Sequence, residues 1–422
     1  MCQYRIFIRF QTISPLFYKI AMSLLYKLLD EKVWIDFYQK KTDPVYCRTD
    51  DAQKLFQYVR EKRYMPVVER ILNGEGLSVP CKKRIAKTDS SKKRIVYSLP
   101  EDESIVLKLM TWMMIREYDW YFQGCLYSFR PDYGTKDALK KLTSIADISQ
   151  YYSYKLDVRN YFNSIDVALL LPQLENLFSD DVPLYNFITS QLSDSRAVDN
   201  GKIVDEPKGV MAGMPYAVFF ANVFLSGLDR EFEQIPQVVY CRYSDDIIIF
   251  SKDKGILDAT KERLLNALAD FHLEVNPSKV SETVPGQPWT FLGFECNGWQ
   301  VDVCRISVEK LKAKMRRKSR ELEKWRRKAG KEGWMAARAF IKHFNKKLYT
   351  SESSSEINWS WWYFPLITTD KSLKVIDSYM QDCVRFIATG SRTKSRYNFT
   401  YSQMKGLGLQ SLVNKWYSFK NQ

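Results

Sequence analysis

The sequence predicts an α+β fold, in which a split βαβ core is followed by an all-helical, strongly basic region. Strand-like apolar runs alternate with segments of helical periodicity in the order β-α-β-β-α-β, which is the split βαβ pattern. The strands lie at 151–162, at 238–251 and in a hairpin at 289–301 that turns at Asn297-Gly298, and the helices at 167–178, 208–232 and 255–273. The composition then changes, because residues 305–350 hold 17 Lys and Arg against 4 Asp and Glu.

The segments before the core have patterns of their own. Residues 22–64 carry apolar side chains at three- and four-residue steps, which predicts helices. Residues 79–98 predict two short strands around a basic turn, because apolar residues flank a cluster of Lys and Arg. Residues 101–122 predict a further helix, capped by Asp102 or Ser104.

Composition narrows the class of protein. The chain has 422 residues, 45% of them hydrophobic, with a formal net charge of +15 and a pI of about 9.2. This is a globular balance, and the basic excess favours a polyanionic partner. Eight Cys without a C-x-x-C pair and only two His argue against a structural zinc site and a disulfide framework. We therefore expect reduced thiols in a cytoplasmic protein.

The N-terminal segment is apolar, but it does not predict a membrane span. Arg and Lys interrupt every apolar run in the first 30 residues. We expect Met22 to be the natural start and 1–21 to be an upstream extension, which N-terminal sequencing of the native protein would test.

Two sites carry carboxylates at the ends of apolar strands. Asp245 and Asp246 stand together between the runs VVYCRY and IIIF, and Asp157 ends the run YYSYKLD. Each acid alone is compatible with a turn or a strand-end cap. Adjacent acids between apolar runs are costly unless a cation compensates them, and Mg²⁺ prefers such hard oxygen ligands. The two sites, with a helical unit between them, therefore favour a metal site that serves phosphoryl transfer.

The motifs around these acids resemble those of the reverse transcriptases. Tyr243 to Asp246 is similar to their Y-x-D-D signature, and 157–162 is similar to their D-x-x-x-aromatic-aromatic motif. Five further blocks match in order: the fingers motif at 91–110, the segment after it at 127–142, the template- and nucleotide-contacting motif at 209–222, the fourth palm motif at 274–280 and the primer grip at 291–294. Ordered blocks are far more specific than a lone Y-x-D-D.

The resemblance implies a right-hand polymerase, with fingers and a palm built on the split βαβ, ferredoxin-like core and an all-α basic thumb. It implies N-terminal helices and fingers at 1–150, a palm with part of the fingers at 151–304, and a helical thumb and C-terminal region at 305–422. Within the family, the tail at 389–420 looks most similar to the bacterial, defence-associated reverse transcriptases of the class 2 group.

The resemblance also implies roles for individual residues. Asp157, Asp245 and Asp246 would be catalytic and would hold two Mg²⁺ ions together with Val158. Phe162 would be a steric gate against the ribose 2′-hydroxyl, although an aromatic residue there is also compatible with a core position. The other implied contacts are, for the nucleotide, Lys93, Arg94, Arg130, Gly213 and Lys279; for the primer grip, Phe291, Leu292 and Gly293; and for the nucleic-acid backbone, Arg316, Arg317, Arg320, Arg326 and Arg327.

These roles predict an RNA-directed DNA polymerase, a nucleotidyltransferase that uses dNTPs and holds an RNA–DNA duplex. The implied template is a companion noncoding RNA in phage defence, with no membrane partner. Two alternatives stay open: template-independent nucleotide addition, as in abortive-infection relatives, and a catalytically silent RNA-binding scaffold. Lys208 and Ala217 depart from the family motif and leave room for the first of these. The identity of the template and primer, the product, the oligomeric state and the trigger are not predicted.

Overall fold

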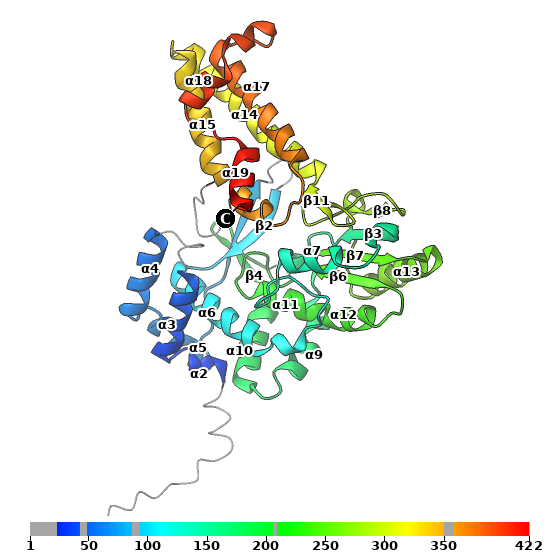
Figure 1. Cartoon of the computed structure of the whole chain (residues 1–422). Coiled ribbons are helices and arrows are strands. Elements are labelled where there is room, and N and C mark those ends of the chain that lie inside the picture. The colour runs from blue at the N-terminus through cyan, green and yellow to red at the C-terminus, as the bar shows by residue number, and fades with distance from the viewer. Residues whose placement is uncertain (1–22, 43–48, 87–92, 206–208, 350–357, 422) are drawn as a thin grey trace, which may run out of the picture.

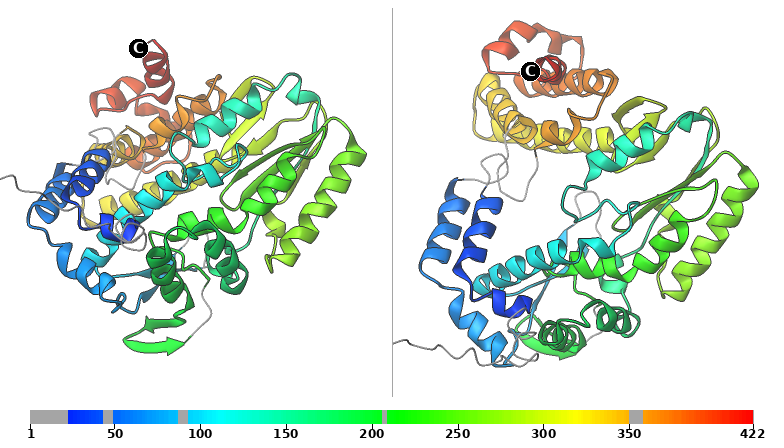
Figure 2. Two further views of the ribbon diagram at one scale, coloured as in Figure 1. Left: turned by 90° about the horizontal axis from the view of Figure 1, so that it is seen from below. Right: turned by 60° about the horizontal axis from the view of Figure 1, so that its bottom comes forward.

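The computed structural model describes residues 23–42, 49–86, 93–205, 209–349 and 358–421. The predicted extension at 1–21, the tip of the basic turn and Lys208 lie outside these described residues. Figure 1 shows the N-terminal helices and the central sheet at opposite ends of one body, with the C-terminal helices above them. Figure 2 shows the same three groups from two other directions.

The central sheet has the strand order of a split βαβ fold. It consists of four antiparallel strands in the order β6-β7-β3-β8. Their bounds are β3 (Tyr152–Asp157), β6 (Val239–Tyr243), β7 (Asp246–Ser251) and β8 (Ser281–Thr283). The helices of this unit are α8 (Tyr161–Ser164), α9 (Val167–Leu177), α10 (Val182–Ser193), α11 (Ala217–Phe224), α12 (Ser226–Glu233) and α13 (Lys254–Asp270). The predicted α+β core is confirmed.

Strand β7 is apolar at successive positions because both faces of the sheet are covered. Ile247 and Ile249 belong to one hydrophobic core, and Ile248 and Phe250 belong to the other. All four are fully buried. A strand that is buried on both sides needs no polar alternation, which explains the IIIF run.

Three details of the predicted core were wrong. The fourth strand of the sheet is β8, and the hairpin at 289–301 forms a separate sheet of β9 (Trp289–Phe291), β10 (Phe294–Asn297) and β11 (Gln300–Val303). Its turn is Gly298-Trp299, because Asn297 pairs with Gln300; this register places Val303 opposite Phe294, and both are buried. The strand predicted at 151–162 ends at Asp157, and Tyr161–Ser164 is helical.

The N-terminal part consists of helices and of two strands of a second sheet. The helices are α2 (Leu24–Lys27), α3 (Glu31–Lys41), α4 (Thr49–Arg60), α5 (Met65–Leu72) and α6 (Glu101–Glu117). Helix α7 (Thr135–Thr143) follows them and lies beside the central sheet (Figure 1), in the same buried cluster as Ile248 and Phe250 of β7. The sheet has the order β2-β1-β4-β5, from β1 (Cys81–Ala86), β2 (Lys93–Ser98), β4 (Arg196–Asp199) and β5 (Lys202–Asp205). Helix α6 begins after Pro100, so the predicted cap at Asp102 or Ser104 was wrong. Asp102 instead pairs with Arg63 at 2.9 Å.

The C-terminal region is helical, as predicted. Helices α14 (Arg305–Lys328), α15 (Gly333–Tyr349) and α17 (Lys371–Thr389) pack against one another. The shorter helices are α16 (Trp359–Tyr363), α18 (Tyr401–Gly406) and α19 (Leu412–Lys420). The proposed boundary after residue 304 falls directly before α14, but the three domain limits stay predictions. Among the described residues, every helix is too short or too polar to cross a membrane.

Candidate active site

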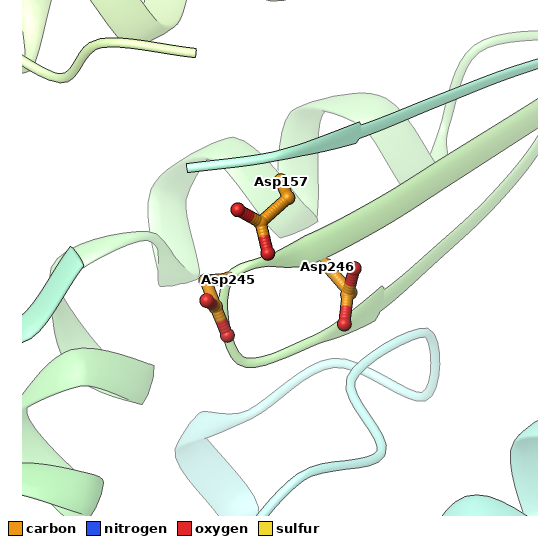
Figure 3. A group of neighbouring side chains, drawn as sticks. All are labelled: Asp157, Asp245 and Asp246. Atoms are coloured by element: carbon orange, nitrogen blue, oxygen red, sulfur yellow. The ribbon is translucent and has the colours of Figure 1, made fainter. Parts of the chain in front are cut away.

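Three carboxylates meet where β3 and β7 lie side by side. Asp157 ends β3 and is directly opposite Asp246, which begins β7. Asp245 lies in the turn just before β7 (Figure 3). One oxygen from each of the three side chains lies within 4.8 Å of the other two. In the described part of the chain, no other group of three Asp, Glu, His or Cys residues meets this spacing.

The turn that carries Asp245 has two residues. Tyr243 of β6 pairs with Asp246 of β7, which leaves Ser244 and Asp245 to connect the strands. Ser244 has a φ of 58°, in the left-handed region that costs a non-glycine residue energy. The Val158 amide donates to the Asp245 carbonyl at 3.0 Å. The turn is therefore attached to the segment that follows Asp157.

The electrostatics of the trio favour a bound cation. Burial, and then the charges of Asp245 and Asp157, raise the pKa of Asp246 to about 7. Burial and the neighbouring Asp157 also raise the pKa of Asp245. The Lys279 ammonium pairs with Asp157, but its side chain is more than half exposed. Lys279 offsets only part of the repulsion among the three carboxylates. Their converging oxygen atoms therefore fit a divalent metal ion, which Asp157, Asp245 and Asp246 would hold.

Phe162 lies on α8, five residues after Asp157, and its position is set by a neighbouring loop. Its carbonyl accepts from the Val210 amide at 3.0 Å. A Cβ on Gly209 would lie 2.5 Å from the same carbonyl oxygen, so only glycine allows this approach. The Phe162 side chain is half-buried and packs against the core, so one part of it contacts the protein and the other part is accessible.

The same loop joins α8 to the fingers strand β2. The Asn163 side chain accepts from the Ala212 amide at 2.7 Å. The Tyr97 amide of β2 donates to the Ala212 carbonyl at 2.8 Å. Gly213 has a φ of 103°, and a Cβ there would lie 2.6 Å from the Tyr97 carbonyl oxygen. Gly213 therefore lets the loop contact β2, while its predicted contact with the nucleotide stays a prediction.

The cations predicted for the nucleotide differ in their surroundings. Lys93 and Arg94 are exposed at the start of β2. Arg130 is instead used within the protein: its side chain is 4% exposed and pairs with Asp119 at 2.8 Å. It also donates to the carbonyls of Gln123 and Leu126. These contacts give Arg130 a role in the protein's own structure, and its predicted contact with the nucleotide stays a prediction.

The predicted primer grip is a tight turn between β9 and β10. Phe291 and Phe294 pair across the turn and are fully buried, so Phe291 is a core residue. Leu292 and Gly293 form the turn, with φ values of 50° and 90°. The Gly293 carbonyl accepts from the Cys304 amide at 3.0 Å, directly before α14, so the turn is joined to the thumb helix.

The five predicted arginines all lie on α14, but some of their guanidinium groups already bond to or pack against other residues of the chain. Arg317 and Arg320 are exposed. Arg316 donates to the Tyr379 hydroxyl at 3.0 Å, and Arg327 pairs with Glu323 at 2.7 Å. Arg326 packs against Gly390, where a Cβ would lie 2.5 Å from its guanidinium. Arg317 and Arg320 are thus the two of this group best placed to meet a polyanion.

The sequence analysis missed a group of buried polar residues beneath the turn. Arg242 and Asp229 are fully buried and pair through two hydrogen bonds, one of 2.7 Å. Although burial opposes its charge, the Asp229 carboxylate raises the pKa of Arg242. The sequence does contain an indication of this pair, because an arginine within the apolar run VVYCRY needs a buried partner.

Comparison with known proteins assigns the family. The family model described as "Reverse transcriptase (RNA-dependent DNA polymerase)" matches residues 85–296, which is half of the chain. No curated protein matches the chain.

Solved structures of telomerase from two Candida species are similar to the chain at low identity. The apo enzyme of Candida tropicalis matches at 11% identity and a TM-score of 0.47, over 79% of this chain and 60% of that one. A version of it truncated from the C-terminal domain matches at 14% identity and 0.44, over 56% and 58%. The Candida albicans enzyme with a telomeric RNA fragment matches at 13% identity and 0.43, over 83% and 68%.

This chain therefore spans about three fifths of the first two telomerases. Its own family does not depend on them, because the match over 85–296 contains all three converging carboxylates. The chain belongs to the reverse transcriptase family of RNA-dependent DNA polymerases.

Proposed function

We propose that this chain copies RNA into DNA by metal-dependent phosphoryl transfer, with two Mg²⁺ ions. The observation that carries the proposal is the convergence of Asp157, Asp245 and Asp246 at the ends of adjacent strands in a reverse transcriptase domain. Bound ions would supply charge neutralisation for the attacking 3′-hydroxyl and for the triphosphate. The protein would supply three fixed carboxylates, with Val158 next to them in the chain.

The residues around the trio support selection of a dNTP. Phe162 lies on a helix whose position is set by the loop at 209–214, so its ring would occupy a defined place near the sugar. A 2′-hydroxyl would then clash with the ring. Lys93 and Arg94 are exposed cations that suit the β- and γ-phosphates. Lys279, already next to Asp157, would meet the leaving pyrophosphate.

The C-terminal helices support contact with an RNA–DNA duplex. Residues 305–350 carry a net charge of +13, from 17 basic and 4 acidic residues. Arg317 and Arg320 project from α14 into solvent. Such cations bind phosphates without sequence preference and in a salt-dependent manner. Leu292 and Gly293 would hold the primer end, since their turn is bonded to the residue before α14.

We further propose that the template is a companion noncoding RNA, and that the chain acts in the bacterial cytoplasm in defence against phage. The support is the similarity of the tail at 389–420 to the class 2 group of defence-associated reverse transcriptases. Sequencing the RNA and cDNA that co-purify with the chain tests this step. Recovery of cDNA copied from many unrelated RNAs would contradict it.

Primer extension tests the activity itself. Wild-type chain is mixed with Mg²⁺, dNTPs and a primer annealed to an RNA template, and then with the same primer alone. We expect a product of template length in the first mixture and none in the second. Extension that persists without template would instead establish template-independent addition. No extension under any condition, together with tight RNA binding, would establish a scaffold.

A further inference from the structure

A buried polar network lies directly beneath the turn that carries Asp245. At its centre are Arg242 and Asp229, both with 0% of their side chains exposed. The Tyr240 hydroxyl also donates to Asp229, at 2.9 Å. Arg242 belongs to β6 and Asp229 to α12, so the pair joins the central sheet to the helix that packs on it. No part of the proposed chemistry uses either group.

The network reaches Ser244 from two sides. The Arg242 guanidinium donates to the Ser244 carbonyl at 3.2 Å. The Ser244 amide donates to the Ser128 hydroxyl at 2.9 Å. Both backbone groups of Ser244 are therefore held by buried side chains. Ser128 and Ser244 are 116 residues apart in the chain, so the contact is a tertiary one.

Asn222 closes the network between these two contacts. Its side chain accepts from the Ser128 hydroxyl at 3.1 Å and donates to the Ser128 carbonyl at 2.7 Å. Its own carbonyl accepts from Arg242 at 3.2 Å. Ser128, Asn222 and Arg242 are all at most 1% exposed. Each polar side chain thus depends on the others for its hydrogen bonds.

Stability alone is a weak reason for such a network. A buried ion pair is often no better for stability than apolar residues of similar volume. A buried polar network does, however, define one geometry, because any other leaves donors or acceptors unpaired. Here the defined element is Ser244, whose φ of 58° is unfavourable for serine. The conformation of Ser244 in turn determines where the Asp245 carboxylate lies.

We propose that Ser128, Asn222, Arg242 and Asp229 are positioning residues, which hold the turn at Ser244 so that Asp245 faces Asp157 and Asp246. The network thereby determines the affinity of the trio for its divalent ion. This inference rests on the proposed function. A ligand shell that is already in place loses less conformational freedom when the ion binds.

The test compares two buried hydroxyls of the chain, those of Ser128 and Ser153. Ser128→Ala removes the acceptor for the Ser244 amide. Ser153→Ala is the matched control, since Ser153 is 2% exposed and bonds to the Thr283 hydroxyl at 2.6 Å, at the far end of β3. Mn²⁺ binding to each protein is followed by the electron paramagnetic resonance signal of the free ion, without substrate. The Mg²⁺ concentration that gives half-maximal primer extension is measured in parallel.

We expect Ser128→Ala to weaken Mn²⁺ binding about tenfold, because the Ser244 amide and the Asn222 side chain each lose a buried hydrogen-bond partner. The half-maximal Mg²⁺ concentration should rise by a similar factor, whereas extension at saturating Mg²⁺ falls by less than about threefold. Ser153→Ala should change metal affinity by less than about twofold. Ser128→Thr, which keeps the hydroxyl, should restore most of the affinity.

Asp229→Asn provides a second test if Ser128→Ala does not fold, because it keeps the shape of the side chain and removes its charge. It too should weaken Mn²⁺ binding. Wild-type affinity in whichever of the two variants folds overturns the inference. If wild-type chain itself binds no Mn²⁺, or if Asp157→Ala leaves binding unchanged, the metal site fails. If only the positioning inference is wrong, wild-type chain still binds Mn²⁺ and Asp157→Ala still weakens that binding.

Discussion

Replacing Asp246 by Asn should stabilise the protein when divalent ions are chelated. In the folded chain, burial and the charges of Asp245 and Asp157 raise the pKa of Asp246 from 3.8 to about 7. At a pH above both values the ionised group costs the folded state about 4 kcal/mol relative to the unfolded state. Asp246 retains some exposure, which reduces this cost, and the amide must still be accommodated. We therefore expect a net gain of about 2 kcal/mol at pH 8.

The stability gained through Asp246→Asn should increase with pH. The folded wild-type chain binds a proton at Asp246 that the unfolded chain has already released between pH 4 and 7. The contribution of this group to stability is therefore greatest below pH 4 and is lost as the pH rises through 7. The advantage of Asp246→Asn should be largest at pH 8 and less than half as large at pH 5. Urea unfolding in EDTA measures both values.

Added Mg²⁺ should make the wild-type chain more stable than Asp246→Asn. Excess Mg²⁺ stabilises the wild-type chain by mass action and stabilises Asp246→Asn much less, because a ligand is gone. Asp270→Asn is the control, since Asp270 is an exposed carboxylate at the end of α13, and its stability should follow wild type within about 0.5 kcal/mol at both pH values. If Asp246→Asn is no more stable than wild type at pH 8 in EDTA, the trio does not carry the repulsion that we infer.

The remaining predictions concern the sugar gate, the turn and the thumb. Phe162→Val should admit rNTPs while dNTP use persists; unchanged sugar selectivity in primer extension would return Phe162 to a packing role. Ser244→Ala should leave stability unchanged or raise it by up to about 1 kcal/mol in urea unfolding, because the buried Ser244 hydroxyl has no partner in the described part of the chain; a large loss would reveal a missed contact. Gly333→Ala should destabilise the thumb by about 3 kcal/mol, since a Cβ would lie 1.9 Å from the Ala388 carbonyl oxygen; Gly330→Ala, with open space around it but a left-handed φ of 57°, should cost only about 1 kcal/mol.

The order of the elements and the three carboxylates were predictable from sequence because each has a local signal. The apolar run after Asp246 predicts a buried strand, and Asp157 ends a similar run. Strand β8 has only three residues, too few for a periodic pattern, so the sequence favours the longer hairpin at 289–301 as the fourth strand. The β4–β5 hairpin and α10 were not predicted. The hairpin joins β1 and β2 through the pairing of β4 with β1, which lies more than a hundred residues earlier.

Side-chain pairing that the local sequence does not reveal explains the other differences between the predicted and the observed site. Arg130 lies in the block at 127–142 that follows the fingers motif, and Asp119, eleven residues earlier, holds its guanidinium. Ser128 and Asn222 lie inside the blocks at 127–142 and 209–222, but nothing in those blocks indicates that the two pair with each other and with Ser244, because these contacts span 94 and 116 residues. The sequence analysis identified the groups suited to bind a metal, but not the buried residues that hold the turn beneath them.

The most direct test of the central claim is RNA-templated primer extension by Asp157→Ala, with Asp270→Asn as control. Asp157 is buried and contributes one of the three converging carboxylates, so its loss should lower the rate of dNTP incorporation at least about a thousandfold. Binding of the RNA–DNA duplex should stay within about twofold of wild type, because the proposed duplex contacts lie on α14 and at the turn of Leu292 and Gly293 and do not include Asp157. Normal extension by Asp157→Ala in Mg²⁺ would contradict the assignment of the trio as the catalytic metal site.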